Sequence, residues 1–317
     1  MHPEGVPTLG SRGLSAGARL LTAGLIVTFT TTSCAFESSN ASGNMVRKTT
    51  SGAASQVPRS DVLSTAPSSA NTSRAGQVST SPGSPAADLP IRTVASVGPL
   101  FNAGLASPHG CTAAVVDSPQ RDVIVTAAHC ISGSGAGVVY APGYDNGNAP
   151  YGTWVVQQAY APAAWLASGD PAADYAYLVV KPSNTNATNL PVQTVVGGNA
   201  VGHAPASGER VMLIGYVAGS NDEAVICTGT VYQTTSYPSV DCPGYADGTS
   251  GTPWLTQYDA TTGTGTVSAV IGGLNGGGCL PDTSYSSPFT TATDVVLARA
   301  ASGAPPDTLP APGPDGC

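Results

Sequence analysis

Short runs rich in Val, Ile, Thr and Tyr recur after residue 90, and Gly, Pro and Asn-Gly turns separate them. Four clear runs are Asp122–Val125, Thr153–Val156, Arg210–Ile214 and Thr266–Ile271. Runs of this length between turn signals are typical of an all-β protein, and no useful length of this region has helical periodicity. About six runs lie on each side of a Pro-, Asn- and Gly-rich connection near 182–208. The pattern predicts two packed six-stranded antiparallel β-barrels, about 91–200 and 201–301, with a cleft between them.

This pattern is missing on both sides of the predicted domain. Residues 36–90 consist mainly of Ser, Thr, Ala, Gly and Pro, with almost no aromatic or branched apolar side chains. Such a segment buries too little surface to offset its chain entropy, so we expect a disordered linker or a propeptide. At the other end, the Pro-rich residues 302–317 predict an extended, solvated tail.

The first 35 residues are typical of an export signal. Arg12 and Arg19 precede an apolar run, Leu20–Phe29, that is too short to span a bilayer comfortably. Two endings compete: Thr31–Cys34 resembles a bacterial lipobox, which would lipidate Cys34 and tether the protein to a membrane, and Ser33–Ala35 would serve equally as a small-residue cleavage site. An uncleaved anchor is the third alternative. We therefore expect a secreted or extracellular protein. If Cys34 is lipidated, the protein would instead be a lipoprotein anchored to a membrane.

The net charge and the spacing of potential metal ligands argue against several kinds of binding partner. The net charge is −8, and from Asp88 onward five Lys and Arg face sixteen Asp and Glu. An acidic folded unit argues against a nucleic-acid partner. No Cys-x₂-Cys or His pair suggests zinc, and the spacing of the Asp residues does not argue for calcium. We expect no cofactor, no metal and a monomer.

Three residues are suited to acyl transfer when they act together. Ser250 lies in Gly248–Pro253, His129 follows Thr126-Ala127-Ala128, and Asp174 opens an apolar run. A serine hydroxyl needs a base to take its proton, a histidine has a suitable pKa, and a carboxylate orients the imidazole. Gly248 allows backbone angles that point successive N–H groups into one concavity. We predict a catalytic triad of these three residues and an oxyanion hole made by the N–H groups of Gly248 and Ser250.

The same segments carry a family resemblance. Val125–Cys130 and Gly248–Pro253 resemble the histidine and Gly-Asp-Ser-Gly-Gly-Pro motifs of the chymotrypsin-like (trypsin-fold) serine peptidases, and His129, Asp174 and Ser250 follow the order of that family. The resemblance covers about residues 92 to 300 and is similar to the secreted bacterial branch that includes the glutamyl endopeptidases. It implies two β-barrels and an active serine. Thr249 stands where animal members have an aspartate, so activation by a newly cut N-terminus is not expected.

Cysteine pairing follows in part from the resemblance. Seven cysteines without Cys34 leave six, an even number for an oxidising compartment. The resemblance implies a disulfide between Cys111 and Cys130. For the other four, Cys227–Cys242 with Cys279–Cys317 is one arrangement, and Cys242–Cys279 with Cys227–Cys317 is the rival.

The resemblance also implies where a substrate would bind. Gly244 lies where a trypsin-like enzyme has its pocket carboxylate, although Asp247 or Asp241 would reach the pocket if the loop is long. Ile271-Gly272-Gly273 is similar to the segment that pairs with the extended substrate backbone. No histidine follows His203, so a strong preference for Glu is not expected, and small or medium apolar side chains are the expected specificity.

Two functions from different classes fit these features. The first is a secreted serine endopeptidase that hydrolyses peptide bonds of a protein or peptide substrate through an acyl-enzyme. The second is a catalytically inactive homologue that acts as a cell-surface binding module. The presence of all three triad residue types favours the first.

Overall fold

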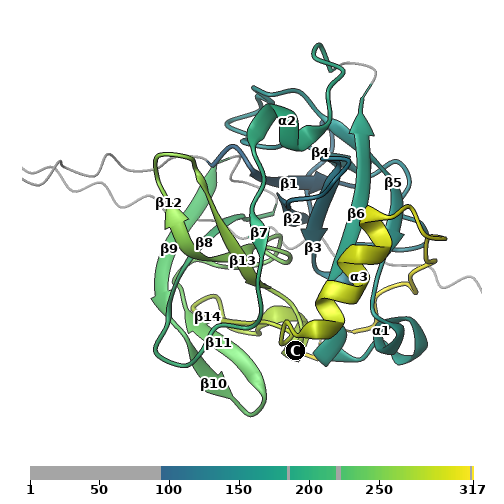
Figure 1. The fold of residues 1–317 in the computed structure, drawn as a ribbon. Helices are drawn as coiled ribbons and strands as arrows, with labels where there is room; N and C mark the ends of the chain where they lie inside the picture. Colours follow the sequence, from purple (N-terminus) through teal and green to yellow (C-terminus); the bar gives the residue numbers. More distant parts are fainter. Residues whose placement is uncertain (1–93, 184–185, 219–222, 315) are drawn as a thin grey trace, which may run out of the picture. The chain divides into compact units, whose positions relative to one another are not determined.

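The computed structural model describes residues 94–183, 186–218, 223–314 and 316–317 (Figure 1). The predictions for residues 1–35 and 36–90, including a lipidated Cys34, lie outside these residues. In the part that is described, no helix is both long and apolar enough to cross a bilayer.

The first half of the domain is a closed antiparallel barrel. Its strands, in order around the barrel, are β1 (Val97–Phe101), β2 (Cys111–Val115), β3 (Val123–Thr126), β6 (Ala176–Pro182), β5 (Trp154–Tyr160) and β4 (Val139–Tyr140). Along β3, Ile124 packs in one apolar cluster, whereas Val123 and Val125 pack in another. Strands buried on both faces have continuous apolar sequences, which explains why β3 is uniformly hydrophobic.

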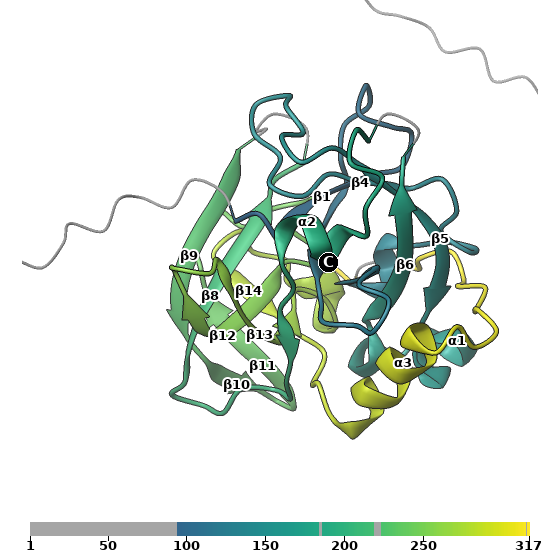
Figure 2. The same ribbon diagram turned by 45° about the horizontal axis from the view of Figure 1, so that its top comes forward.

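The second half is mostly antiparallel but differs from the predicted second barrel. Its strands form a five-stranded sheet and a three-stranded sheet rather than one closed barrel. The larger sheet has the order β7 (Ala200–Val201), β13 (Thr264–Val270), β12 (Pro253–Asp259), β8 (Arg210–Tyr216) and β9 (Ala224–Thr230). The smaller has the order β10 (Tyr232–Thr234), β11 (Tyr237–Asp241) and β14 (Thr283–Tyr285). Figure 2 shows both sheets on the side of the domain away from β5 and β6.

Three disulfides join segments that are distant in sequence. Cys111 pairs with Cys130, Cys227 with Cys242, and Cys279 with Cys317. This is the first of the two arrangements considered from the sequence. Cys227 lies in β9 and Cys242 directly follows β11, so their disulfide links the two sheets of the second half. An antiparallel bridge between Ile271 and Ser286 also joins them.

One apolar cluster extends through both halves of the domain. It contains Phe101 and Tyr177 from the first barrel and Tyr216 and Leu255 from the five-stranded sheet, all almost fully buried. Burial of large side chains from both halves in one core fixes how the halves meet, and the predicted site lies along that junction.

The domain is mostly β, as predicted, but it also contains short helices that no periodicity in the sequence indicated. Three α-helices are present in the described residues: α1 (Ala163–Ser168), α2 (Val192–Val196) and α3 (Thr291–Ala301). In α3 the Thr290 side chain accepts a hydrogen bond from Ala292 N–H, and the Thr293 hydroxyl accepts one from Thr290 N–H. These caps satisfy N–H groups that the first turn leaves open. The helix lies against β5 and β6 (Figure 1).

The Pro-rich tail is exposed along most of its length, as expected, but one of its residues is anchored in the barrel. Leu309 is buried in the core cluster of the first barrel, and its N–H and C=O both bond to Gly133. Residues 310–314 are exposed but are held between Leu309 and the disulfide of Cys317. Proline content predicts the extended backbone, but it does not predict that Leu309 packs on the barrel.

Candidate active site

His129 lies in a single turn of 3₁₀ helix, η1 (Ala128–Cys130), soon after β3. Ala127 and Ala128 before it are fully buried, so the turn rests directly on the barrel. The disulfide of Cys130 with Cys111 connects the end of this turn to the start of β2. Small buried residues on one side and a covalent link on the other fix the backbone that carries the imidazole.

Asp174 follows a second 3₁₀ turn, η2 (Pro171–Ala173), whose N-terminus is capped by the Asp170 side chain. Its N–H donates to the Ser287 hydroxyl oxygen at 2.9 Å, and that hydroxyl donates to the Pro171 carbonyl at 2.7 Å. Ser287 therefore holds the turn that positions the carboxylate. The sequence analysis missed this residue, because nothing in its local sequence distinguishes it from other serines near Pro288.

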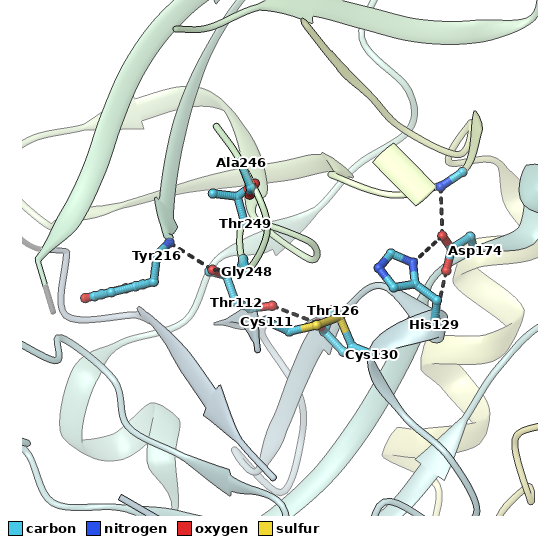
Figure 3. Close-up of a disulfide and its surroundings, with 11 residues drawn as sticks. Cys111, Thr112, Thr126, His129, Cys130, Asp174, Tyr216, Ala246, Gly248 and Thr249 are labelled. Carbon is cyan, nitrogen blue, oxygen red and sulfur yellow. Dashed lines mark hydrogen bonds and ion pairs between the residues drawn. A yellow bond between two sulfur atoms is a disulfide. The ribbon is translucent and has the colours of Figure 1, made fainter. Parts of the chain in front are cut away.

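The Asp174 carboxylate binds His129 at two points (Figure 3). Oδ2 lies 2.7 Å from the imidazole Nδ1, and Oδ1 accepts a 2.9 Å hydrogen bond from the His129 backbone N–H. Oδ2 also accepts a 2.8 Å hydrogen bond from Gly273 N–H. These contacts fix the ring orientation and place the proton on Nδ1, which leaves Nε2 as the basic nitrogen.

The carboxylate is ionised although it is almost completely buried. Burial by itself raises the pKa of Asp174, but the charge of His129 and the hydrogen bonds from His129 and Gly273 lower it further, so the net pKa lies below its ordinary value. A buried, ionised carboxylate beside an imidazole stabilises the imidazolium form of that ring.

The loop around Ser250 depends on two glycines with positive φ. Gly251 has φ 82°, and a Cβ there would overlap the Thr112 carbonyl and the Thr126 hydroxyl. Gly248 has φ 91°, and a Cβ there would overlap Ala218. Both positions therefore require glycine for backbone angle and for space, which explains the Gly-Thr-Ser-Gly pattern.

Thr112 ties this loop to the strand that carries the disulfide (Figure 3). Its N–H donates to the Ser250 carbonyl at 2.8 Å, and its hydroxyl donates to the Gly248 carbonyl at 3.3 Å. Its carbonyl accepts from the Thr126 hydroxyl at 2.7 Å, just before the histidine turn. One threonine thus connects the serine loop with the histidine segment. Nothing in the local sequence around Thr112 indicated this role.

The two N–H groups predicted to bind an oxyanion make no hydrogen bond to another described residue. In the loop, Thr249 N–H donates to Ala246 and Gly251 N–H donates to Ile271. Within the described residues, no protein acceptor takes the N–H of Gly248 or of Ser250. Two unused donors beside a serine can stabilise a developing negative charge.

The N–H groups of the predicted substrate-pairing segment are used inside the protein. Ile271 N–H donates to Thr252, Gly272 N–H to Tyr285, and Gly273 N–H to Asp174. The carbonyls of Ile271 and Gly273 also accept hydrogen bonds, from Gly251 N–H and Gly276 N–H, so these internal bonds compete with substrate pairing along the segment. Gly273 instead supports the carboxylate, a role that its glycine-rich context did not reveal.

A cavity of about 1080 Å³ brings the predicted residues together. His129, Asp174, Gly248, Ser250 and Gly273 line it, as does Ile271. Gly244 and Gly272, both predicted to bind substrate, do not line it, whereas residues 245–247 do. The Tyr245 hydroxyl donates to the Leu213 and Val225 carbonyls.

The lining of the cavity is acidic. Its described residues include Asp174 and Asp247 but no Lys or Arg, and His129 is its one histidine. Cys111, His129 and Cys130 lie close enough to resemble metal ligands, but the two sulfurs are joined in a disulfide and offer no thiolate.

Comparisons with known proteins agree with this geometry. Residues 111–267 match the trypsin-like peptidase domain family. The crystal structure of the protease Anisep from Arthrobacter nicotinovorans is similar, with a TM-score of 0.56, 26% identity, 67% of this chain covered and 98% of that one. A thermostable serine protease, AL20, from an extremophilic microorganism has a TM-score of 0.56 at 23% identity, covering 66% and 98%. No curated protein matches the chain.

The closed barrel, the second β half and a His–Asp pair that shares a cavity with a serine define the chymotrypsin-like class of serine peptidases. The described domain belongs to that family, and the matched segment contains all three predicted triad residues.

Proposed function

We propose that the protein is a serine endopeptidase that hydrolyses peptide bonds through an acyl-enzyme. The observation that carries the proposal is the buried Asp174 carboxylate, which holds His129 through Nδ1 and the backbone N–H beside a cavity that Ser250 also lines. A binding module has no need for an ionised carboxylate that is buried against an imidazole.

In the proposed mechanism, Ser250 attacks the scissile carbonyl while His129 Nε2 accepts the hydroxyl proton. Asp174 keeps the ring oriented and stabilises the imidazolium. The N–H groups of Gly248 and Ser250 bind the oxyanion of the tetrahedral intermediate. His129 then gives its proton to the leaving amine, and a water molecule resolves the acyl-enzyme by the same steps in reverse.

Labelling with a fluorophosphonate probe tests the activated serine. The unmodified chain should gain one adduct, and Ser250→Ala should gain none. Ser207→Ala is the control, because Ser207 is an exposed serine outside the cavity. Absence of an adduct on folded, disulfide-bonded protein would instead support the catalytically inactive homologue.

We further propose specificity for small or medium apolar side chains at the cleaved bond. Apolar residues such as Ile271 and Leu274 line the cavity and support this preference. The absence of Lys and Arg from the lining leaves a glutamate side chain without a partner. A peptide library scanned at that position should show the lowest kcat/KM for Glu and Asp. Dominant cleavage after Glu, Lys or Arg would overturn this specificity.

We also propose export of the chain. Three disulfides support an oxidising compartment. The export signal and the alternative of a lipidated Cys34 rest on the sequence of residues 1–35 alone. The intact mass of the mature protein, after expression in a bacterial host, would show the cleavage site and any lipid.

A further inference from the structure

The chain after α3 is fixed to the first barrel by a charged contact. Arg299 donates to both carboxylate oxygens of Asp307, at 2.7 and 3.1 Å. Asp307 Oδ2 also accepts from Ala161 N–H at 3.0 Å, and Asp307 N–H donates to the Ala159 carbonyl at 2.9 Å. The two backbone bonds place Asp307 beside the end of β5.

A second anchor lies two residues later. Leu309 is 2% exposed and packs in the core cluster of the first barrel. Its N–H and carbonyl form a pair of hydrogen bonds with Gly133, at 2.8 and 2.9 Å. Gly133 lies only four positions after His129, so this anchor ends next to the catalytic turn.

The segment beyond Leu309 then passes along the active-site cavity. Pro310–Pro314 are exposed, and all five line the cavity that contains His129 and Ser250. Pro312 also lines an adjoining pocket of about 400 Å³ beside His129 and Cys130. We call Pro310–Pro314, with Gly316 and Cys317, the Pro-rich strap.

The strap ends on the opposite side of the cavity. Cys317 is disulfide-bonded to Cys279, which follows the Gly272–Gly277 segment. Cys317 Sγ also lies 3.7 Å from the carbonyl of Asn275, in the turn η3 (Leu274–Gly277) that contacts β14 in the second half of the domain. Eight residues from Leu309 to Cys317 reach at most about 26 Å, so a strap fixed at both ends has little freedom to swing away.

We propose that the Pro-rich strap is a substrate filter that crosses the mouth of the cleft and excludes bonds held in folded proteins. This inference rests on the proposed peptidase function. A short flexible peptide can thread past a strap that leaves a cavity of about 1080 Å³. A loop of a folded protein can enter the cleft only together with the domain that carries it. That domain would collide with the strap before the loop reached Ser250.

The disulfide that fixes the strap is the accessible one. Cys279 and Cys317 are both exposed, whereas Cys242 is fully buried and Cys111 and Cys130 are half-buried. Since thiol exchange requires access to the sulfur, mild reductant should open Cys279–Cys317 first. The strap can therefore be released in two ways, by the double substitution Cys279→Ser/Cys317→Ser or by limited reduction of the unmodified chain.

The test compares two substrates with the same cleavable sequence, chosen from the peptide library. One is a six-residue fluorogenic peptide, and the other carries the same six residues in a loop of a folded carrier protein. Releasing the strap should raise kcat/KM for the carrier by about tenfold or more, equivalent to about 1.4 kcal/mol. For the peptide, kcat/KM should change by less than about twofold, because it already passes the strap.

Controls separate the filter from the active site and from stability. Cys227→Ser/Cys242→Ser removes a disulfide away from the strap and should not raise carrier cleavage. If the double substitution at Cys279 and Cys317 prevents folding, limited reduction of the unmodified chain replaces it. Alkylation and mass spectrometry then show which cysteines were reduced. Normal fluorophosphonate labelling with an unchanged carrier-to-peptide ratio would overturn the filter alone. No labelling of any variant would overturn the proposed function and the filter with it.

Discussion

Replacement of Asp174 by Asn tests the part of the site on which the mechanism depends most. The carboxylate accepts three hydrogen bonds, from Nδ1 and N–H of His129 and from Gly273 N–H. An asparagine has one acceptor oxygen and one NH₂ donor. If the oxygen takes the Oδ2 position, the NH₂ group opposes His129 N–H. If the oxygen instead takes the Oδ1 position, the NH₂ group faces both Gly273 N–H and the imidazole Nδ1. Nδ1 must then accept a hydrogen bond, which is the wrong tautomer for catalysis.

Both orientations also remove the negative charge that stabilises the imidazolium. We therefore expect kcat/KM to fall by about 10⁴, as this substitution does in a serine–histidine–aspartate triad. That factor corresponds to about 5.4 kcal/mol of transition-state stabilisation. The assay is hydrolysis of the fluorogenic peptide together with the rate of fluorophosphonate labelling, on protein whose Tm shows that it is folded.

The chain contains a matched control for this substitution. His203 and Asp294 form a second His–Asp pair at 2.9 Å, but their side chains are 52% and 51% exposed, against 21% and 2% for His129 and Asp174. An exposed pair contributes about 0–1 kcal/mol, so Asp294→Asn should leave kcat/KM unchanged. A loss of less than tenfold in Asp174→Asn, or an equal loss in the two variants, would refute the reasoning.

Four further predictions follow from the same geometry. Asp174 has a lowered pKa, so its stabilising effect is full above its unfolded value of 3.8 and is lost as the pH falls through the lower folded value. Urea unfolding should therefore show the largest stability difference between wild type and Asp174→Asn above about pH 4. Gly251→Ala should abolish labelling because its Cβ would overlap the backbone, whereas Gly263→Ala, with φ 67° and open space, should only lower Tm through a cost of about 1 kcal/mol. Ser287→Ala should reduce kcat about tenfold with little change in KM, since it loosens the Asp174 turn. Leu309→Ala should cost about 2–4 kcal/mol in urea unfolding, because it leaves a cavity in the barrel core.

The sequence predicts most of the first barrel and the local setting of the triad. The runs at 122–125 and 153–156 each begin one residue before a strand, β3 and β5. Those at 210–214 and 266–271 overlap β8 and β13. These predictions rest on local features, namely residues suited to strands and glycines that a turn requires. The roles of His129, Asp174 and Ser250 in catalysis stay predictions.

What the sequence does not predict depends on long-range contacts. α3 is only 11 residues long, and a helix of that length is marginal by itself. It is stabilised by threonine caps and by packing of Val296 and Ala300 on the barrel. Thr112 and Ser287 each act on residues more than 100 positions away. The strap is built from prolines, one buried leucine and a disulfide, and only the fold shows that it passes along the cavity.

The central claim is that Ser250 becomes acylated during turnover. The most direct measurement is rapid acid quenching of the reaction with a peptide ester, followed by mass spectrometry of the intact chain and its fragments. The account predicts one acyl group per chain, located on Ser250, which appears before steady state and is absent in Ser250→Ala. Turnover of the ester without acylation of Ser250, or an equal rate in the Ser250→Ala variant, would contradict it.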